Sequence, residues 1–163
     1  MQKILNLMIS LGLLLLSACA SVDYSQKAVF PEASADKALI YFYRTPGFIG
    51  STYRFNVIEP SRTEKNKKVG AMAQDSYFYL FANAGEHTYS VDDRNKEQGS
   101  FITINVQAGK TYYIRVDVEY ELVGGKPVFT EVSKSEAMQV LPTRKYVVPA
   151  KVNSATFNVH AEQ

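Results

Sequence analysis

The chain has 163 residues, of which 46% are hydrophobic and 21% are charged, and its formal net charge is +2. This length suits one globular domain and is short for two. The near-neutral charge argues against a nucleic-acid-binding protein, which usually carries a basic excess, and the single cysteine excludes a disulfide within the chain.

Residues 1–18 have the pattern of a secretory signal peptide. Lys3 provides a basic start, and residues 4–16 form an almost wholly apolar run. A run of this length is typical of the hydrophobic region of a signal peptide and is too short for a membrane-spanning helix. We therefore expect residues 1–18 to be removed during export.

The leader ends in Leu16-Ser17-Ala18-Cys19, which resembles the lipobox of bacterial lipoproteins. The resemblance implies cleavage before Cys19, transfer of a diacylglyceryl group to its sulfur, and acylation of its new amino group with a fatty acid such as palmitate. Two or more acyl chains together give a stable anchor in a membrane. The alternative is a free, buried cysteine, which the position directly after an export leader disfavours.

The residue after the cysteine bears on the compartment. In Gram-negative lipoproteins an Asp at this position tends to hold the protein in the inner membrane, whereas here it is Ala20. The resemblance therefore implies a lipid-anchored protein of the outer membrane that faces the periplasm, rather than one of the inner membrane.

Residues 19–36 are mostly small and polar and show no sustained periodicity. This composition predicts a lipidated tether between the anchor and the domain. Its apolar residues Tyr24, Val29 and Phe30 are candidates to dock on the domain.

Residues 37–141 carry strand patterns separated by turns. Residues 38–43 are apolar on both faces, as in a central strand that is buried on both sides. Residues 101–106 and 111–122 alternate between apolar and polar positions, as strands with one buried face do. Further strands are expected in segments 52–58, 68–72, 76–81, 87–91 and 128–132, with turns at 83–86, 108–110 and 124–125.

These patterns predict an all-β fold, namely an antiparallel β-sandwich of about seven strands. No helix-length segment lies between the strands, so parallel crossover connections are disfavoured. Ser133 and Glu136 have the spacing of a capping box, which predicts a short C-terminal helix that Pro142 limits. Residues 142–163 are weakly patterned and are expected to form a C-terminal tail.

Three groups of motifs carry a family resemblance. They are Leu39–Arg44 followed by Pro46–Gly50, Ser76–Tyr79 followed by Ala84–Thr88, and Gly109–Val116. In this order they resemble a family of short bacterial lipoproteins built on a domain of unknown function, and they are also similar to PEGA-type modules with prealbumin-like sandwiches. The resemblance implies a fold, an anchor and a compartment, and it implies no known activity.

The candidate catalytic chemistry centres on His87. A Ser-His-Asp triad would need Ser76 or Ser90 together with Asp92 or Asp93, and the chain has no Gly-x-Ser-x-Gly elbow. The alternative, which we favour, is that His87 caps or packs at the start of a strand. We therefore expect no enzyme, no catalytic residue and no cofactor.

Two acidic segments are candidate binding sites. The loop 92–97 is faintly similar to a calcium-binding loop. Such a loop requires a bidentate Glu at its twelfth position, and counted from Asp93 this position is Ile104. We therefore expect no metal site. Asp117, Glu119 and Glu121 share one face of a strand. They form either a docking or cation-binding stripe or, as we favour, an exposed face paired with basic residues.

The segment Lys65–Lys68 could contact anionic lipid or wall polymer, although a polar loop that discourages edge pairing is the preferred interpretation. Most of the 11 tyrosines occupy inward positions of strands, where packing explains them. Tyr43 and Tyr113 are the candidates for exposed rings that stack on a sugar.

We therefore predict a lipid-anchored lipoprotein of the cell envelope. Its β-sandwich would bind an envelope protein or a wall polymer such as peptidoglycan, with no nucleic-acid partner. The alternative is a periplasmic small-ligand carrier or hydrolase with a cleft near His87, and a pocket lined by His87 and a carboxylate would favour it.

Overall fold

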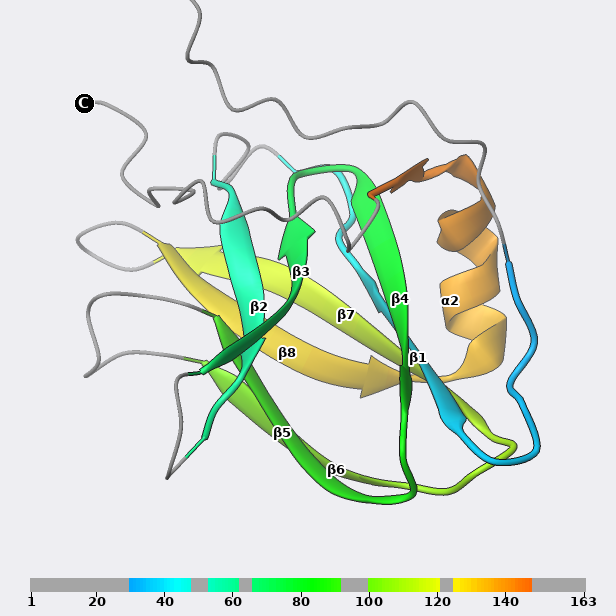
Figure 1. The fold of residues 1–163 in the computed structure, drawn as a ribbon. Coiled ribbons are helices and arrows are strands. Elements are labelled where there is room, and N and C mark those ends of the chain that lie inside the picture. The colour runs from blue at the N-terminus through cyan, green and yellow to red at the C-terminus, as the bar shows by residue number, and fades with distance from the viewer. Residues whose placement is uncertain (1–29, 48–52, 62–65, 92–99, 121–124, 148–163) are drawn as a thin grey trace, which may run out of the picture.

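The computed structural model describes residues 30–47, 53–61, 66–91, 100–120 and 125–147 as two packed β-sheets with one short helix (Figure 1). The strands are β1 (Ala38–Tyr43), β2 (Phe55–Glu59), β3 (Lys67–Met72), β4 (Ser76–Ala82), β5 (Gly85–Val91), β6 (Phe101–Val106), β7 (Thr111–Tyr120), β8 (Gly125–Val132) and β9 (Lys145–Tyr146). The helix α2 (Lys134–Val140) continues into a 3₁₀ turn, η1 (Leu141–Thr143). The predicted β-sandwich with a short C-terminal helix is confirmed.

The two sheets share the strands unevenly. One sheet has five strands in the order β8-β7-β1-β4-β9, and the other has four in the order β3-β2-β5-β6. The described residues thus form nine strands where about seven were predicted. The additional short strand β9 packs on the domain from the segment predicted to be a tail.

The antiparallel part of the prediction requires a correction at two places. β1 runs parallel to β7, and β4 runs parallel to β9, while the other paired strands are antiparallel. A parallel neighbour needs a long connection, usually a helix, and the lack of a helix-length segment between the strands led us to disfavour parallel pairing. Here the chain between β1 and β7 passes through strands of both sheets, and this all-β path replaces the helical crossover.

β1 is the central strand of the larger sheet, as its sequence predicted. All six of its residues are buried. Ile40 and Phe42 join the core between the sheets, where the ring of Phe42 stacks on Phe78 with centroids 5.1 Å apart. Leu39 and Tyr41 face the opposite side and join a second apolar cluster. A strand that is buried on both faces is therefore apolar at every position.

Helix α2 covers the outer face of the five-stranded sheet (Figure 1). The side chain of Ser133 accepts a hydrogen bond from the backbone N–H of Glu136 at 3.2 Å, so the predicted helix cap is confirmed. Ala137 and Leu141 are fully buried against the outer residues of β1. The helix thereby gives the larger sheet a second buried face.

Two glycine turns connect the sheets. Gly85 (φ +131°) is the first residue of β5, at the turn from β4, and Gly109 (φ +78°) lies between β6 and β7. Glycine adopts such backbone angles without a steric penalty. Because each turn joins strands of different sheets, both act as corners of the sandwich and not as hairpins.

Candidate functional site

An inter-sheet cleft opens at the end of the sandwich where β4 turns into β5. Its volume is about 600 Å³, which lies within the range of small-molecule sites. The second half of β4 contributes one wall, and the opposite wall comes from the end of β2 and the starts of β3 and β5. These segments all lie in the lower part of Figure 1.

The floor of the inter-sheet cleft is the edge of the apolar core. Ala82 and Tyr89 are buried in that core, and Val69 and Leu80 are half-buried and pack against it. Burial raises the pKa of the Tyr89 phenol, and the negative charge of Glu59 adds to this effect. The floor therefore presents neutral, mainly apolar surface.

The side chains of His87 and Glu59 are in direct contact at one side of the cleft. The Nδ1 atom of His87 lies 2.7 Å from Oε1 of Glu59, and its Nε2 atom lies 2.9 Å from the carbonyl oxygen of Asn83. Each of the two ring nitrogens thus faces an oxygen atom that can accept a hydrogen bond. The ring also stacks on Tyr89 with centroids 6.0 Å apart. His87 is thus held on three sides.

Lysines form the rim of the same cleft. The Nζ atom of Lys67 lies 3.7 Å from Oε2 of Glu59, and its side chain is 74% exposed. Lys37 and Lys68 also line the opening. Three lysines and one carboxylate, which already contacts His87, thus line this opening. The rim has a positive excess as a result.

The predicted triad residues do not come together around His87. Ser76 is fully buried at the start of β4, where its hydroxyl donates to the carbonyl of Ala73 at 2.7 Å. Ser90 is three residues beyond His87 on the same strand, so it faces the opposite side of the sheet. Asp92 and Asp93 lie outside the described residues, as does the rest of loop 92–97. Neither serine is placed as a nucleophile for His87.

The acidic face of β7 is paired with basic side chains. Arg115 donates to Asp117 at 2.7 Å and to Glu136 of α2 at 2.5 Å. Glu119 lies directly opposite Lys126 of β8. This arrangement matches the favoured interpretation of a paired sheet face, although Glu121 lies outside the described residues. Within the described part of the chain, no three His, Cys, Asp or Glu residues are grouped to hold a metal ion.

The two tyrosines considered for sugar stacking are both buried. Tyr43 is 1% exposed and Tyr113 is 6% exposed. The ring of Tyr113 stacks on Tyr41 with centroids 5.5 Å apart. Burial raises the pKa of both phenols. Helix α2 covers this face, so neither ring offers a stacking surface.

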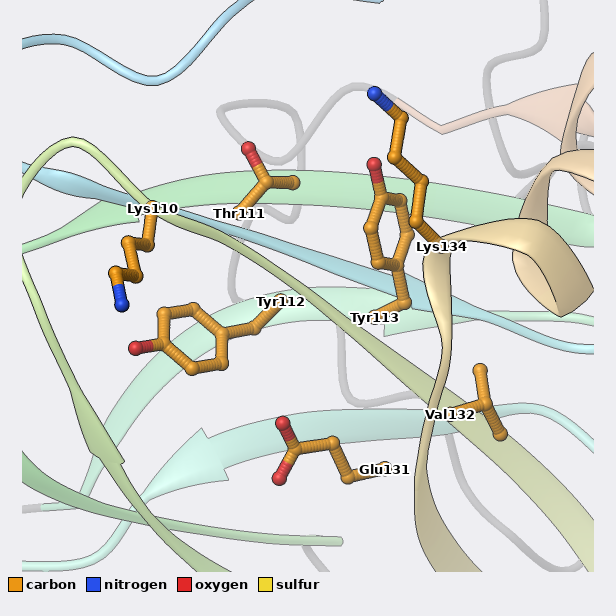
Figure 2. Close-up of a pocket in the computed structure, with 7 residues that line it drawn as sticks. All are labelled: Lys110, Thr111, Tyr112, Tyr113, Glu131, Val132 and Lys134. Atoms are coloured by element: carbon orange, nitrogen blue, oxygen red, sulfur yellow. The ribbon is translucent and has the colours of Figure 1, made fainter.

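A second hollow, of about 350 Å³, lies between the start of β7, the end of β8 and the start of α2. In Figure 2 the ammonium groups of Lys110 and Lys134 point away from each other, and the carboxylate of Glu131 lies apart from both. The side chains around this hollow do not converge on a common point, so we assign it no site.

The predicted lipid attachment residue Cys19 lies outside the described residues, together with Tyr24 and Val29. Phe30, the first described residue, does dock on the domain as the sequence suggested. Its ring stacks on Tyr77 with centroids 5.4 Å apart and an interplanar angle of 7°. No helix in the described ranges is long and apolar enough to cross a bilayer.

Comparisons with known proteins place the chain in a family. The profile of DUF2846, described as a protein family of unknown function, matches residues 34–128. The chain belongs to the DUF2846 family. A curated relative, an uncharacterized protein of Haemophilus influenzae (strain ATCC 51907 / DSM 11121 / KW20 / Rd), is 30% identical over 134 residues, which cover 78% of this chain and 75% of the relative. No solved structure matches the chain significantly.

The sequence analysis found His87 but missed Glu59 and Lys37. Glu59 is 28 positions from His87 along the chain and lies just beyond the predicted strand 52–58, yet it is the last residue of β2. No local pattern links these residues to one another. They meet at the cleft because parts of four strands, β2, β3, β4 and β5, and the residue preceding β1 converge there.

Proposed function

We propose that this DUF2846 protein is a lipid-anchored protein of the cell envelope whose sandwich binds a ligand in the inter-sheet cleft. The anchor would be formed at Cys19 after removal of residues 1–18, and the domain would face the periplasm from the outer membrane. The leader and the lipobox-like residues 16–19 support the anchor. The cleft lined by His87 and a carboxylate supports ligand binding.

The cleft is the observation that carries the binding role. It combines an apolar floor with convergent polar groups, which is the usual composition of a ligand site. This geometry favours the carrier over the hydrolase, because both ring nitrogens of His87 already face oxygen atoms. A histidine engaged in this way is a poor candidate for a general base.

Mass spectrometry of the protein purified from its membrane tests the anchor. We expect a mature chain that begins at Cys19 and carries a diacylglyceryl group and an additional acyl chain. An intact Met1 or an unmodified thiol would contradict the proposed compartment.

Photo-crosslinking in cells tests the binding site. A photoreactive amino acid is placed at Phe81, which lines the cleft and is 43% exposed, and at Met138 on α2, which is 38% exposed, as the matched control. We expect a captured species at position 81 that is absent at position 138. Equal capture at both positions, or none at position 81, would contradict binding in the cleft.

Docking of an envelope protein or wall polymer is the second candidate function, and one observation favours it. β6 is an edge strand of the four-stranded sheet, and Phe101 on it is 69% exposed, the most exposed large apolar side chain in the described ranges. Edge strands can accept an added strand from a partner. Capture of a protein or glycan from position 101, without capture from position 81, would support this function over the first.

A further inference from the structure

We propose that the ligand of the inter-sheet cleft is an anionic amphiphile. Its apolar chain would lie on the cleft floor, and its phosphate or carboxylate group would contact the rim lysines. This inference rests on the proposed function, because it assumes that the cleft is the binding site.

The apolar floor of the cleft favours a ligand with an apolar chain. Val69 and Leu80 are half-buried at the cleft and pack on the core behind it. Covering them with an apolar group removes their remaining surface from water, which is favourable in proportion to the area buried. A wholly polar solute gains nothing from this surface.

The lysines of the rim favour a ligand with a negatively charged group. Lys37 precedes β1 of the five-stranded sheet, whereas Lys67 and Lys68 begin β3 of the four-stranded sheet. Lysines from both sheets therefore line one opening. An anion at this opening would meet cationic groups from two sides, and hydrogen bonds to charged groups are stronger than neutral ones.

Glu59 does not cancel this charge. Its Oε1 atom lies 2.7 Å from His87, and its Oε2 atom faces Lys67 at 3.7 Å. The contact between Oε2 and Lys67 is too long for a hydrogen bond, so it does not prevent Lys67 from turning toward an incoming anion. The lysine side chain is 74% exposed and can turn toward a ligand without unfolding any strand.

The test uses the mature, lipidated full-length protein in nanodiscs of neutral phosphatidylcholine. The probe is dodecyl phosphate that carries a photoreactive diazirine, and labelled peptides are identified by mass spectrometry. Decyl phosphate, dodecyl phosphate, dodecanoate, inorganic phosphate and the neutral dodecyl maltoside serve as competitors. We expect labelling of peptides that contain β3 and β4.

Each part of the amphiphile has its own competitor. Each buried methylene strengthens binding about fourfold, so dodecyl phosphate, with two more methylenes, should compete about fifteenfold better than decyl phosphate. Dodecanoate should compete about as well as dodecyl phosphate, because its carboxylate would contact the same rim lysines. Inorganic phosphate and dodecyl maltoside should each compete at least about tenfold less well.

Variants connect the binding to the cleft. The double variant with Lys37→Gln and Lys67→Gln should lose about tenfold in labelling, while Lys134→Gln, an exposed lysine on α2, should label as the unchanged protein does. Leu80→Phe, which fills the floor, should also reduce labelling. Circular dichroism confirms that each variant is folded.

Three results would overturn the inference. They are equal competition by dodecyl maltoside, competition by inorganic phosphate that matches dodecyl phosphate, and the same loss of labelling in Lys134→Gln. If crosslinking from position 81 captures a polar solute while no anionic amphiphile labels the protein, the ligand class is wrong and the cleft remains the binding site. Absence of any capture at position 81 contradicts the proposed function itself.

Discussion

Gly70 of β3 lies directly against the ring of Phe78 of β4. A methyl group at Gly70 would lie 2.4 Å from two ring carbons of Phe78, which is closer than real side-chain atoms approach. Both residues are buried, and they belong to different sheets. The absence of a side chain at position 70 therefore sets the distance between the sheets beside the cleft.

We expect Gly70→Ala to destabilise the protein by about 1–3 kcal/mol, because overpacking forces a buried ring from its position. Urea denaturation followed by circular dichroism measures the free energy of unfolding. Combining the change with Phe78→Leu should cost less than the sum of the two single changes, since the smaller side chain relieves the clash. Strict additivity would show that the contact with Phe78 is not the cause.

Asp75 supports the turn between β3 and β4 through its backbone and its charge. It has a φ of +57°, and its carboxylate pairs with Arg144, whose side chain is 14% exposed. Asp75→Ala should cost about 1–3 kcal/mol, since it leaves a largely buried cation without this partner and places Ala at an unfavourable φ. Thermal and urea denaturation give the values.

Asp75→Gly separates these two effects. Glycine adopts the positive φ freely but also loses the ion pair. The glycine variant should therefore be about 1 kcal/mol more stable than the alanine variant. If the two variants are equally stable, the backbone conformation contributes nothing at this position.

The contact between His87 of β5 and Glu59 of β2 should contribute to the stability of the fold. We expect a double-mutant cycle with His87→Ala and Glu59→Gln to give a coupling energy of about 0.5–1.5 kcal/mol, because the contact is a partly buried, charge-assisted hydrogen bond. The cycle is measured by urea denaturation at neutral pH. A cycle on Lys67 and Glu59 serves as the control and should give less, because that lysine is mostly exposed and the atoms are 3.7 Å apart.

We expect the buried tyrosines to make the folded protein less stable at alkaline pH. Burial raises the pKa of Tyr41, Tyr89 and Tyr146 above the ordinary value of 10.0. In the unfolded chain these phenols ionise near pH 10, whereas in the folded chain they remain protonated. Their contribution to stability is therefore present below pH 10 and is lost as the pH rises above it.

Urea denaturation between pH 8 and pH 11 checks this expectation, with absorbance at alkaline pH reporting ionised tyrosine. Tyr89→Phe should reduce the slope of stability against pH, because phenylalanine cannot ionise in either state. Tyr112→Phe, at a half-buried position, is the comparison variant. An unchanged slope in Tyr89→Phe would contradict the assignment of the effect to burial.

The fold was largely predictable because local patterns report local burial. Alternation in residues 101–106 identified a strand, and the doubly apolar segment 38–43 identified the central strand that lies under α2. The capping pair Ser133 and Glu136 located the helix to within a residue. The parallel pairing of β1 with β7 was missed, since strand order depends on contacts between residues far apart along the chain.

The site was less predictable for the same reason. His87 stood out as a rare residue beside a turn, but a histidine alone does not reveal its partner. Glu59 and Lys37 come from separate segments, and nothing in the spacing of the chain links them to His87. The sequence also suggested exposed rings at Tyr43 and Tyr113, because a strand pattern does not show that a helix will cover its outer face.

Residue order alone was sufficient to indicate the β-rich class, the C-terminal helix and the lipobox-like residues that end at Cys19, since each depends on neighbours within a few positions. The mixed order of the strands, the burial of both faces of the larger sheet and the cleft that joins Glu59, His87 and the lysines were decided by the tertiary structure. Packing two twisted sheets brings distant segments together, and such long-range contacts leave no periodic trace in the chain.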